Sequence, residues 1–416
     1  MSFSALPLRG VSWTAAFPVE LPLSNRVRDR TPLVEVVMRL ETLFYREGQG
    51  WSAPLPSAMD GVRTAVFAFG ASSFAARPQQ LLELRRAFPN SVVMGCSTAG
   101  EIVGDRVQDE GIVIAVARFE GVDLRAACVP IGRGEASFEA GTEVARRLAR
   151  PDLRAMIVLS EGLEVNGSRL VDGMNSITPA SVVVTGGLAA DGDRFRATWV
   201  FDGEDLGARR VVVLGLYGDR LAVTHGSKGG WDIFGLERRV TRSDGNVLYE
   251  LDGKPALRLY KDYLGERASG LPATALLFPL SMRTNGVDEK RLVRTVLSVD
   301  EATQSMTFAG DIPTGSLVQL MRANFDRLVQ GASDAAAQAR VSRAGTGDIL
   351  SLAISCVGRR LVLGERTEEE LEATVEALPK GAKQVGFYSY GEISPFASGS
   401  CDLHNQTMTL STVAEA

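Results

Sequence analysis

The sequence predicts an α/β fold, with α+β left open, in which two modules contain mixed β-sheets flanked by helices. Three observations favour it. Short apolar runs rich in Val and Ile, such as TAVFAFG at residues 64–70, are typical of strands buried on both faces. Stretches with helical spacing separate these runs, and glycine-bearing turns follow them. The order of strand, helix and strand also recurs three times, which indicates one architectural unit used repeatedly.

The N-terminal residues 1–60 are expected to form a helical appendage and a linker. Thr31-Pro32 precedes apolar residues at helical spacing as far as Tyr45, which predicts a helix there. The Gly, Pro and Ser residues of EGQGWSAPLPSAMDG indicate a linker after it. Two modules are expected to follow, at residues 61–225 and 226–416.

The predicted unit consists of a strand, a helix, a proline, a second strand and a glycine turn. The first strands end at Gly70, Ser160 and Cys356, and the second strands end at Gly95, Gly186 and Gly386. In the third copy, Thr367 and Glu370 predict a capping box at the start of the helix. A further helical stretch is expected at residues 315–340, outside this repeat.

Two of the three glycine turns share residues at the same offsets. GCSTAGEI (95–102) and GFYSYGEI (386–393) both place Gly, a small hydroxyl residue, Gly, Glu and Ile in that order. Hydroxyl, amide and carboxylate groups therefore gather at a strand end, where α/β sheets build ligand sites. The alternative is structural, with each Glu capping backbone donors. The candidate ligand-binding residues are Cys96, Ser97, Thr98, Gly100, Glu101, Gly186, Gly187, Tyr388, Ser389, Tyr390, Gly391 and Glu392.

Composition excludes several classes of protein. The 416 residues carry 45 Lys+Arg against 50 Asp+Glu, for a formal net charge of -5. This balance, with no cluster of basic residues, argues against a nucleic-acid partner. No apolar run approaches the ~18 residues of a spanning helix, and no secretory signal is evident. We therefore expect no membrane insertion and a cytoplasmic location. The four cysteines form no C-x-x-C pair, so no metal site is predicted.

The turns and their neighbours together resemble the FIST family. GCSTAGEI, then GGLAADGDRF before ATWVFDG, then GFYSYGEISP before CDLHNQTMTL follow in this order over roughly residues 61–413. The resemblance implies a FIST-N and a FIST-C module, which are regarded as sensory domains for small ligands in signal transduction. We expect a non-catalytic protein that holds a small molecule between the modules, and Glu101 and Glu392 would suit the ammonium group of an amino-acid-like ligand. Output would pass to a separate partner such as a histidine kinase or a cyclic-di-GMP enzyme, and a homodimer is left open.

A haem-based nitric oxide sensor is the first alternative, because some members of this family are haem proteins. The chain has two histidines, His225 and His404, and haem iron needs an axial ligand of this kind. His225 ends LAVTH, before a Gly-rich turn that carries Trp231 and Phe234. That apolar and aromatic surrounding would suit a macrocycle.

An enzyme is the second alternative. Cys96 lies beside two hydroxyl residues and is the nearest candidate for a nucleophile, although it needs a base or a lowered pKa. Glu101 and Glu392 could instead face one another across a cleft and shift each other's pKa.

Overall fold

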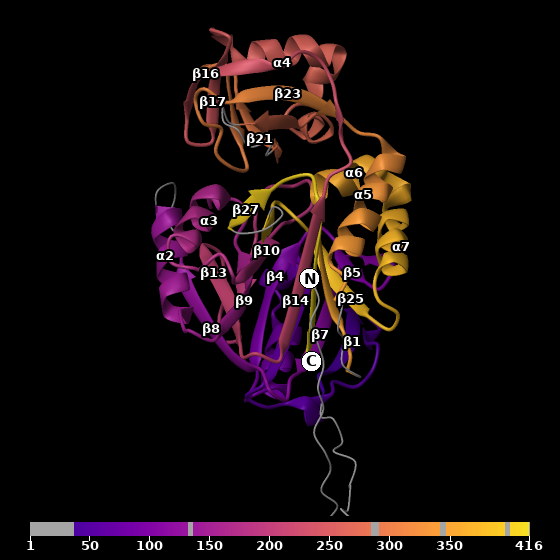
Figure 1. Ribbon diagram of the computed structural model, residues 1–416. Coiled ribbons are helices and arrows are strands. Elements are labelled where there is room, and N and C mark those ends of the chain that lie inside the picture. Colours follow the sequence, from indigo (N-terminus) through magenta and orange to yellow (C-terminus); the bar gives the residue numbers. More distant parts are fainter. Residues whose placement is uncertain (1–36, 132–135, 284–290, 342–346, 396–399, 416) are drawn as a thin grey trace, which may run out of the picture. The chain divides into compact units, whose positions relative to one another are not determined.

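The computed structural model describes residues 37–131, 136–283, 291–341, 347–395 and 400–415, and the chain from Val36 onward forms one compact unit. The predicted α/β fold is confirmed: mixed sheets are flanked by helices (Figure 1). The α-helices are α1 (Gln79–Ala87), α2 (Ala136–Leu148), α3 (Gly167–Asn175), α4 (Ala256–Leu264), α5 (Phe325–Gln338), α6 (Val357–Leu363) and α7 (Thr367–Ala377). The 3-10 helices are η1 (Ser57–Met59), η2 (Ser72–Ala75), η3 (Gly265–Gly270), η4 (Ala273–Leu277) and η5 (Gly364–Arg366). None of the described helices has the length and apolar character needed to cross a membrane.

Three of the sheets share one plan. The first has the order β12 (Leu206–Gly207), β11 (Val200–Phe201), β4 (Val92–Thr98), β3 (Thr64–Ala71), β7 (Ile112–Arg118), β1 (Arg39–Arg46) and β2 (Gly50–Trp51). The second has the order β27 (Cys401–His404), β26 (Glu392–Pro395), β10 (Val183–Leu188), β9 (Leu153–Ser160), β13 (Arg210–Tyr217) and β8 (Asp123–Pro130). The third has the order β14 (Leu221–Lys228), β28 (Met408–Glu415), β24 (Leu350–Cys356), β25 (Lys383–Ser389), β5 (Glu101–Val103) and β6 (Arg106–Gln108).

The fourth sheet lies within residues 232–322 and falls outside this plan. Its order is β20 (Arg291–Arg294), β19 (Leu280–Arg283), β23 (Leu317–Arg322), β16 (Arg238–Asp244), β17 (Val247–Leu251), β22 (Ser305–Phe308) and β21 (Val296–Asp300). Two short strands join it, β15 (Asp232–Ile233) beside β23 and β18 (Lys254–Pro255) beside β17.

The predicted three-fold repeat is confirmed. The pairs β3 and β4, β9 and β10, and β24 and β25 are each parallel, and a helix lies between the two strands in the sequence. Parallel strands need such a crossover because a short turn cannot return the chain to the same end of the sheet. An antiparallel strand, β7, β13 or β28, completes the core of each unit.

In each unit, the strand that follows the glycine turn pairs with a strand of another unit. The strand β5 leaves the first unit and pairs with β25 of the third. The strand β26 leaves the third unit and pairs with β10 of the second, and β11 leaves the second and pairs with β4 of the first. The exchange is cyclic, so the three glycine turns lie where the sheets meet.

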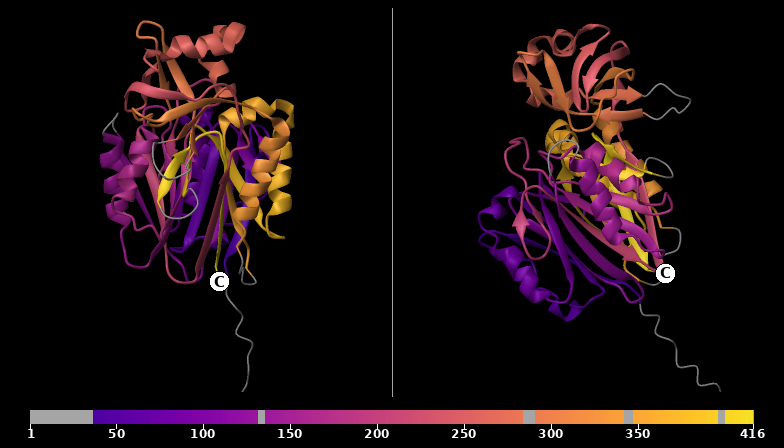
Figure 2. Two further views of the ribbon diagram at one scale, coloured as in Figure 1. Left: turned by 45° about the horizontal axis from the view of Figure 1, so that its top comes forward. Right: turned by 90° about the vertical axis from the view of Figure 1, so that its left-hand side faces the viewer.

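The alternation of side chains along the strands explains how the sheets pack. Phe67 and Phe69 of β3 point into a core shared with Ile157 of β9 and Leu352 of β24, whereas Val66 points to the opposite face. Helices cover the opposite faces. Figure 1 shows α2 and α3 beside β13 and β8, and α5 and α7 beside the third sheet. Figure 2 shows α1, in indigo, outside the first sheet.

Four local predictions are corrected. The helix predicted to end at Tyr45 is wrong in its described part, because Arg39–Arg46 is strand β1 and pairs with β7, with Leu40 opposite Ala117; residues 31–36 lie outside the described part. The capping box is wrong as well. The hydroxyl of Thr367 donates to the carbonyl of Gly364, and the Glu370 carboxylate forms a buried ion pair instead.

The helical stretch predicted at residues 315–340 begins only at Phe325, because residues 317–322 form strand β23. Asn324 starts α5, and its side chain accepts a hydrogen bond from the Arg327 amide at 3.2 Å. His225 also lies inside strand β14, which continues to Lys228, and not at the end of a strand as expected.

Candidate functional site

Close packing between neighbouring strands explains the first glycine of each turn. Gly95, Gly186 and Gly386 lie directly opposite Ala68, Val158 and Ala353 on the parallel partner strands. A Cβ atom at these glycines would lie 2.2, 1.9 and 1.7 Å from the carbonyl oxygens of those three partners. No side chain fits at such distances, so these glycines are needed for strand packing. Gly187 is less tightly enclosed, since its Cβ would lie 2.8 Å from the Ile354 side chain.

The Glu101 side chain is buried at the end of the first turn. Its Oε1 accepts a hydrogen bond from the Thr98 hydroxyl, and its Oε2 accepts one from the Gly111 amide at 3.3 Å. Burial raises the pKa of Glu101 to about 8, although these donors act in the opposite direction. The carboxyl group is therefore mostly protonated at pH 7.

The Glu392 side chain has matching contacts in the other turn. The Ser389 hydroxyl donates to Oε1 at 2.7 Å, and the hydroxyl and amide of Thr407 donate to Oε2 at 2.9 and 3.2 Å. Burial raises the pKa of Glu392 to about 8 as well. Glu101 stands on the third sheet opposite Phe387, and Glu392 on the second sheet opposite His404. Each carboxyl accepts from the hydroxyl residue of its own turn and from one residue outside that turn, Gly111 or Thr407.

Only the first of these two turns lines a described pocket. The turn pocket, as we name it, has a volume of ≈ 650 Å³, and Thr98, Ala99, Gly100 and Glu101 line it. Six carboxylate side chains line it among the described residues: Glu101, Asp109, Glu110, Asp193, Glu365 and Glu368. Two arginines, Arg194 and Arg360, accompany them. The pocket is therefore mainly acidic, with cationic groups at two points.

The Arg360 guanidinium joins the turn pocket to helix α6. It donates to the Ala99 carbonyl and, at 2.6 Å, to the Asp109 carboxylate. Its centre lies 5.6 Å from the centre of the Tyr388 ring. A Cβ atom on Gly100 would collide with this guanidinium, so the second glycine of the turn makes room for Arg360. Arg194 is exposed and donates to the Ser72 hydroxyl at 3.1 Å.

The sequence interpretation missed a fully buried ion pair beneath the second turn. Arg359 donates from Nε and Nη2 to one oxygen of Glu370, at 3.0 and 2.7 Å. The other Glu370 oxygen accepts from the hydroxyls of Tyr388, at 2.8 Å, and Ser355, at 3.1 Å. Arg359 also donates to the Leu328 carbonyl at 2.8 Å. An ordinary surface helix pattern, TEEELEATVEA, gave no sign of this pair.

The remaining candidate residues are internal. Cys96 lies in the core shared by the three sheets, and burial raises the pKa of its thiol well above the ordinary value, which disfavours a nucleophilic thiolate. The Ser97 hydroxyl accepts from the Trp199 amide at 3.0 Å. Tyr390 stacks on Phe195 with ring centres 4.6 Å apart. Gly391 packs against the side chains of Leu188 and Leu403.

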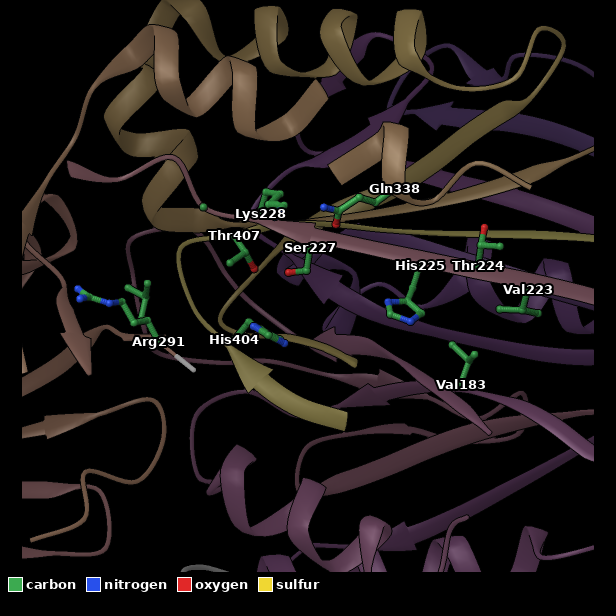
Figure 3. A pocket seen from close by; sticks show the side chains of 12 residues that line it. Val183, Val223, Thr224, His225, Ser227, Lys228, Arg291, Gln338, His404 and Thr407 are labelled. Atoms are coloured by element: carbon green, nitrogen blue, oxygen red, sulfur yellow. The ribbon is translucent and has the colours of Figure 1, made fainter. Parts of the chain in front are cut away.

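Both histidines line a second pocket of ≈ 700 Å³, the histidine pocket, together with residues of β14, β20 and α5 (Figure 3). The expected aromatic surrounding is elsewhere: Trp231 donates from Nε1 to the Gln406 carbonyl at 2.9 Å, and Phe234 is exposed. Nε2 of His404 lies 3.0 Å from the Ser394 carbonyl oxygen. One of the two imidazoles is thus engaged, and the described lining supplies no aromatic wall, so the arrangement gives the haem alternative no support. Within the described residues, no group of three His, Cys, Asp or Glu could hold a metal ion.

Comparison with known families agrees with this architecture. Family models match residues 64–254 as a FIST N domain and residues 256–395 as a FIST C domain. The chain therefore belongs to the FIST family, whose domains are sensory domains of signal transduction.

Individual relatives are more distant. The chain is 26% identical over 282 residues to an uncharacterized protein of Methanocaldococcus jannaschii, covering 60% of this chain and 52% of that protein. It is 28% identical over 269 residues to an uncharacterized protein of Mycobacterium tuberculosis, covering 61% and 66%. The matched part thus spans about half of the first relative and about two thirds of the second. A chorismatase crystal structure aligns over 92% of this chain and 99% of that chain, with a TM-score of 0.34 and 10% identity.

Proposed function

We propose that this protein is a sensor that binds a small, amino-acid-like molecule in the turn pocket. The observation that carries the proposal is that residues of both FIST domains line this pocket: Thr98 and Glu101 belong to the FIST N span, and Arg360 belongs to the FIST C span. A ligand in contact with both spans stabilises the arrangement that it binds best, which is the basis of a sensory response.

The charges of the turn pocket favour a zwitterionic ligand. Its acidic side chains suit an ammonium group. Arg194 donates to the Ser72 hydroxyl and forms no ion pair with a described carboxylate, so it is available for a ligand carboxylate. Glu101 is mostly protonated at pH 7, whereas a bound ammonium group favours the ionised form. Ligand binding should therefore release a proton, and the affinity should rise with pH up to about 8.

The proposal includes the output. We place the protein in the cytoplasm and propose that it acts on a separate signalling protein, such as a histidine kinase or a cyclic-di-GMP enzyme. The role of FIST domains in signal transduction supports this part.

The test is a thermal-shift screen of the twenty amino acids, followed by calorimetric titration of those that stabilise the protein. Arg194→Ala should weaken binding about 10-fold or more, because a charge-assisted hydrogen bond contributes about 1.5–3 kcal/mol. Arg196→Ala is the matched control, since Arg196 is also exposed and lines no described pocket. Glu101→Gln should abolish the proton release. If both Arg194→Ala and Glu101→Gln leave the affinity unchanged, the turn pocket is not the binding site.

A further inference from the structure

The chain enters the fourth sheet through one short segment and leaves it through another. Residues 229–231 lead from strand β14 into β15, and residues 323–328 lead from β23 into the first turn of helix α5. The two segments pack closely, because a Cβ atom on Gly230 would lie 2.2 Å from the Arg327 carbonyl oxygen. We call residues 229–231 and 323–328 together the junction.

The Arg359 guanidinium binds both segments of the junction. It donates from Nη1 to the Gly229 carbonyl and from Nη2 to the Leu328 carbonyl, the latter at 2.8 Å. The side chain is fully buried, and its ion pair with Glu370 holds it in place. The donors of a guanidinium point in fixed directions, so a displacement of Arg359 changes the hydrogen bonds to both segments.

An apolar cluster surrounds these hydrogen bonds. Trp231 of the first segment and Leu328 of the second pack with Met321 and with Leu363, the last residue of helix α6. The Trp231 indole also donates from Nε1 to the Gln406 carbonyl at 2.9 Å. Helix α6 therefore contacts the junction through a polar residue and an apolar one.

The same helix contacts the turn pocket with the next residues of the chain. Arg360 and Leu361 line that pocket. Because α6 is one short helix, a displacement of Arg360 also shifts Arg359. Tyr388 provides a second connection, since its ring centre lies 5.6 Å from the centre of the Arg360 guanidinium and its hydroxyl donates to Glu370 at 2.8 Å.

We propose that helix α6 transmits the occupancy of the turn pocket to the fourth sheet. A ligand in the turn pocket displaces Arg360, α6 moves with it, and Arg359 changes the hydrogen bonds that hold Gly229 and Leu328. The fourth sheet, which falls outside the repeated plan, is then the part of the molecule that responds. This inference rests on the proposed function, because it takes the turn pocket as the ligand site.

The first experiment displaces Arg360 without a ligand. A Cβ atom on Gly100 collides with the Arg360 guanidinium, so Gly100→Ala imitates pressure from the turn pocket. Gly104→Ala is the matched control, because Gly104 also has a positive φ and no described atom lies within 4 Å of its Cβ position. The chain has four tryptophans, so incorporation of fluorotryptophan gives few fluorine resonance signals, and Trp231→Phe identifies the one from the junction. That signal should move by more than its own linewidth in Gly100→Ala and stay in place in Gly104→Ala.

Hydrogen exchange of the full chain gives a second readout with a milder variant. Arg360→Met removes the contacts of α6 on the side of the turn pocket, so amides in residues 229–234 and 324–332 should exchange about 3-fold faster or more. Arg85→Met is the control, because Arg85 is also a helical arginine that donates to a carboxylate, of Glu204, and to a backbone carbonyl, of Pro89. It should leave exchange at the junction unchanged.

A third variant separates α6 from the junction. Arg359→Lys keeps the charge beside Glu370 but lacks the fixed directions of the guanidinium donors, so Gly100→Ala should no longer move the Trp231 signal in this background. An undiminished shift in this background would overturn the proposal, as would an equal shift in Gly104→Ala. Unchanged junction exchange in Arg360→Met would also overturn it, including where Gly100→Ala does not fold. These results need no ligand, so they are distinct from a failure of the amino-acid screen, which counts against the proposed function.

Discussion

The two similar glycine turns, 95–102 and 386–393, have the same backbone role and different surroundings. Each ends a buried strand, and each holds a glutamate whose pKa is raised to about 8. The difference lies at the fifth position, where the first turn has Ala99 and the second has Tyr390. Ala99 lines the turn pocket, whereas the Tyr390 ring is buried and stacks on Phe195. A small residue at this position thus accompanies the pocket, and a large buried ring accompanies the turn without one.

The third position separates the turns in a second way. Ser97 accepts one backbone hydrogen bond, whereas Tyr388 joins the buried pair of Arg359 and Glu370. The neighbouring Arg360 serves the first turn through the Ala99 carbonyl. Two consecutive arginines of helix α6 therefore contact the two turns. Arg359 reaches the second turn inside the protein through Glu370 and Tyr388, and Arg360 reaches the first turn beside the turn pocket. The second turn is built for stability and the first for access.

Removal of the inner arginine should have the largest effect. Arg359→Met leaves the Glu370 carboxylate buried without its ion-pair partner, which typically costs about 3–5 kcal/mol of unfolding free energy. Arg360→Met removes a pair with the mainly exposed Asp109 and should cost about 1 kcal/mol. Urea denaturation measures both. The double variant Arg359→Met/Glu370→Met should recover much of the loss, and equal losses for the two single arginine variants would contradict the comparison.

Opening the second turn is the next test. Tyr390→Ala removes a buried ring and should destabilise the protein by about 3 kcal/mol, a typical cost for a large aromatic residue in a core. Tyr390→Phe keeps the ring and loses the hydrogen bond to Asp191, so it should cost only about 1–2 kcal/mol. A thermal or urea unfolding series distinguishes the two. A smaller loss for Tyr390→Ala than for Tyr390→Phe would show that the ring does not fill this space.

The sequence predicted the repeat well because its signals are local. Buried strands need continuous apolar residues, and glycines at 95, 186 and 386 are forced by the carbonyl oxygen opposite each. The strand β1 was mistaken for a helix because Leu40 and Leu43 fit a helical spacing. Pairing with β7 decides its conformation, and that partner lies about 70 residues further along the chain.

The pockets could not be predicted, because they depend on side chains from distant segments. The acidic wall of the turn pocket combines Asp109, Asp193 and Glu365, which belong to different units. Glu370 follows Thr367 at the spacing of a capping box, yet its carboxylate forms an ion pair with Arg359. A local pattern identifies such residues as polar and does not identify the partner.

Filling the first turn should remove ligand binding at a modest cost in stability. Ala99→Phe places a ring where the turn pocket now lies, so the affinity for the amino acid found in the thermal-shift screen should fall more than about 10-fold. Overpacking of this kind costs about 1–3 kcal/mol, which leaves the protein folded. Calorimetry measures the affinity and circular dichroism the fold. Ala99→Ser is the control and should bind normally; normal binding by Ala99→Phe would place the ligand elsewhere.

A pH-dependent effect should come from the two glutamates. Burial raises the pKa of Glu101 and Glu392 to about 8, so the folded protein holds protons that the unfolded chain releases above its ordinary pKa near 4.5. The stability contributed by protonation is complete below pH 4.5 and is lost as the pH rises to about 8, by at most ~1.4 kcal/mol per pH unit for each group. Glu392→Gln and Glu101→Gln should each flatten the fall of unfolding free energy between pH 5 and 8, as measured by urea denaturation. Of the two glutamates, only Glu101 lines the turn pocket. Glu101→Gln should therefore also remove the pH dependence of ligand affinity, whereas Glu392→Gln should leave it unchanged. The same pH dependence of affinity in both variants would mean that the two turns do not differ in access.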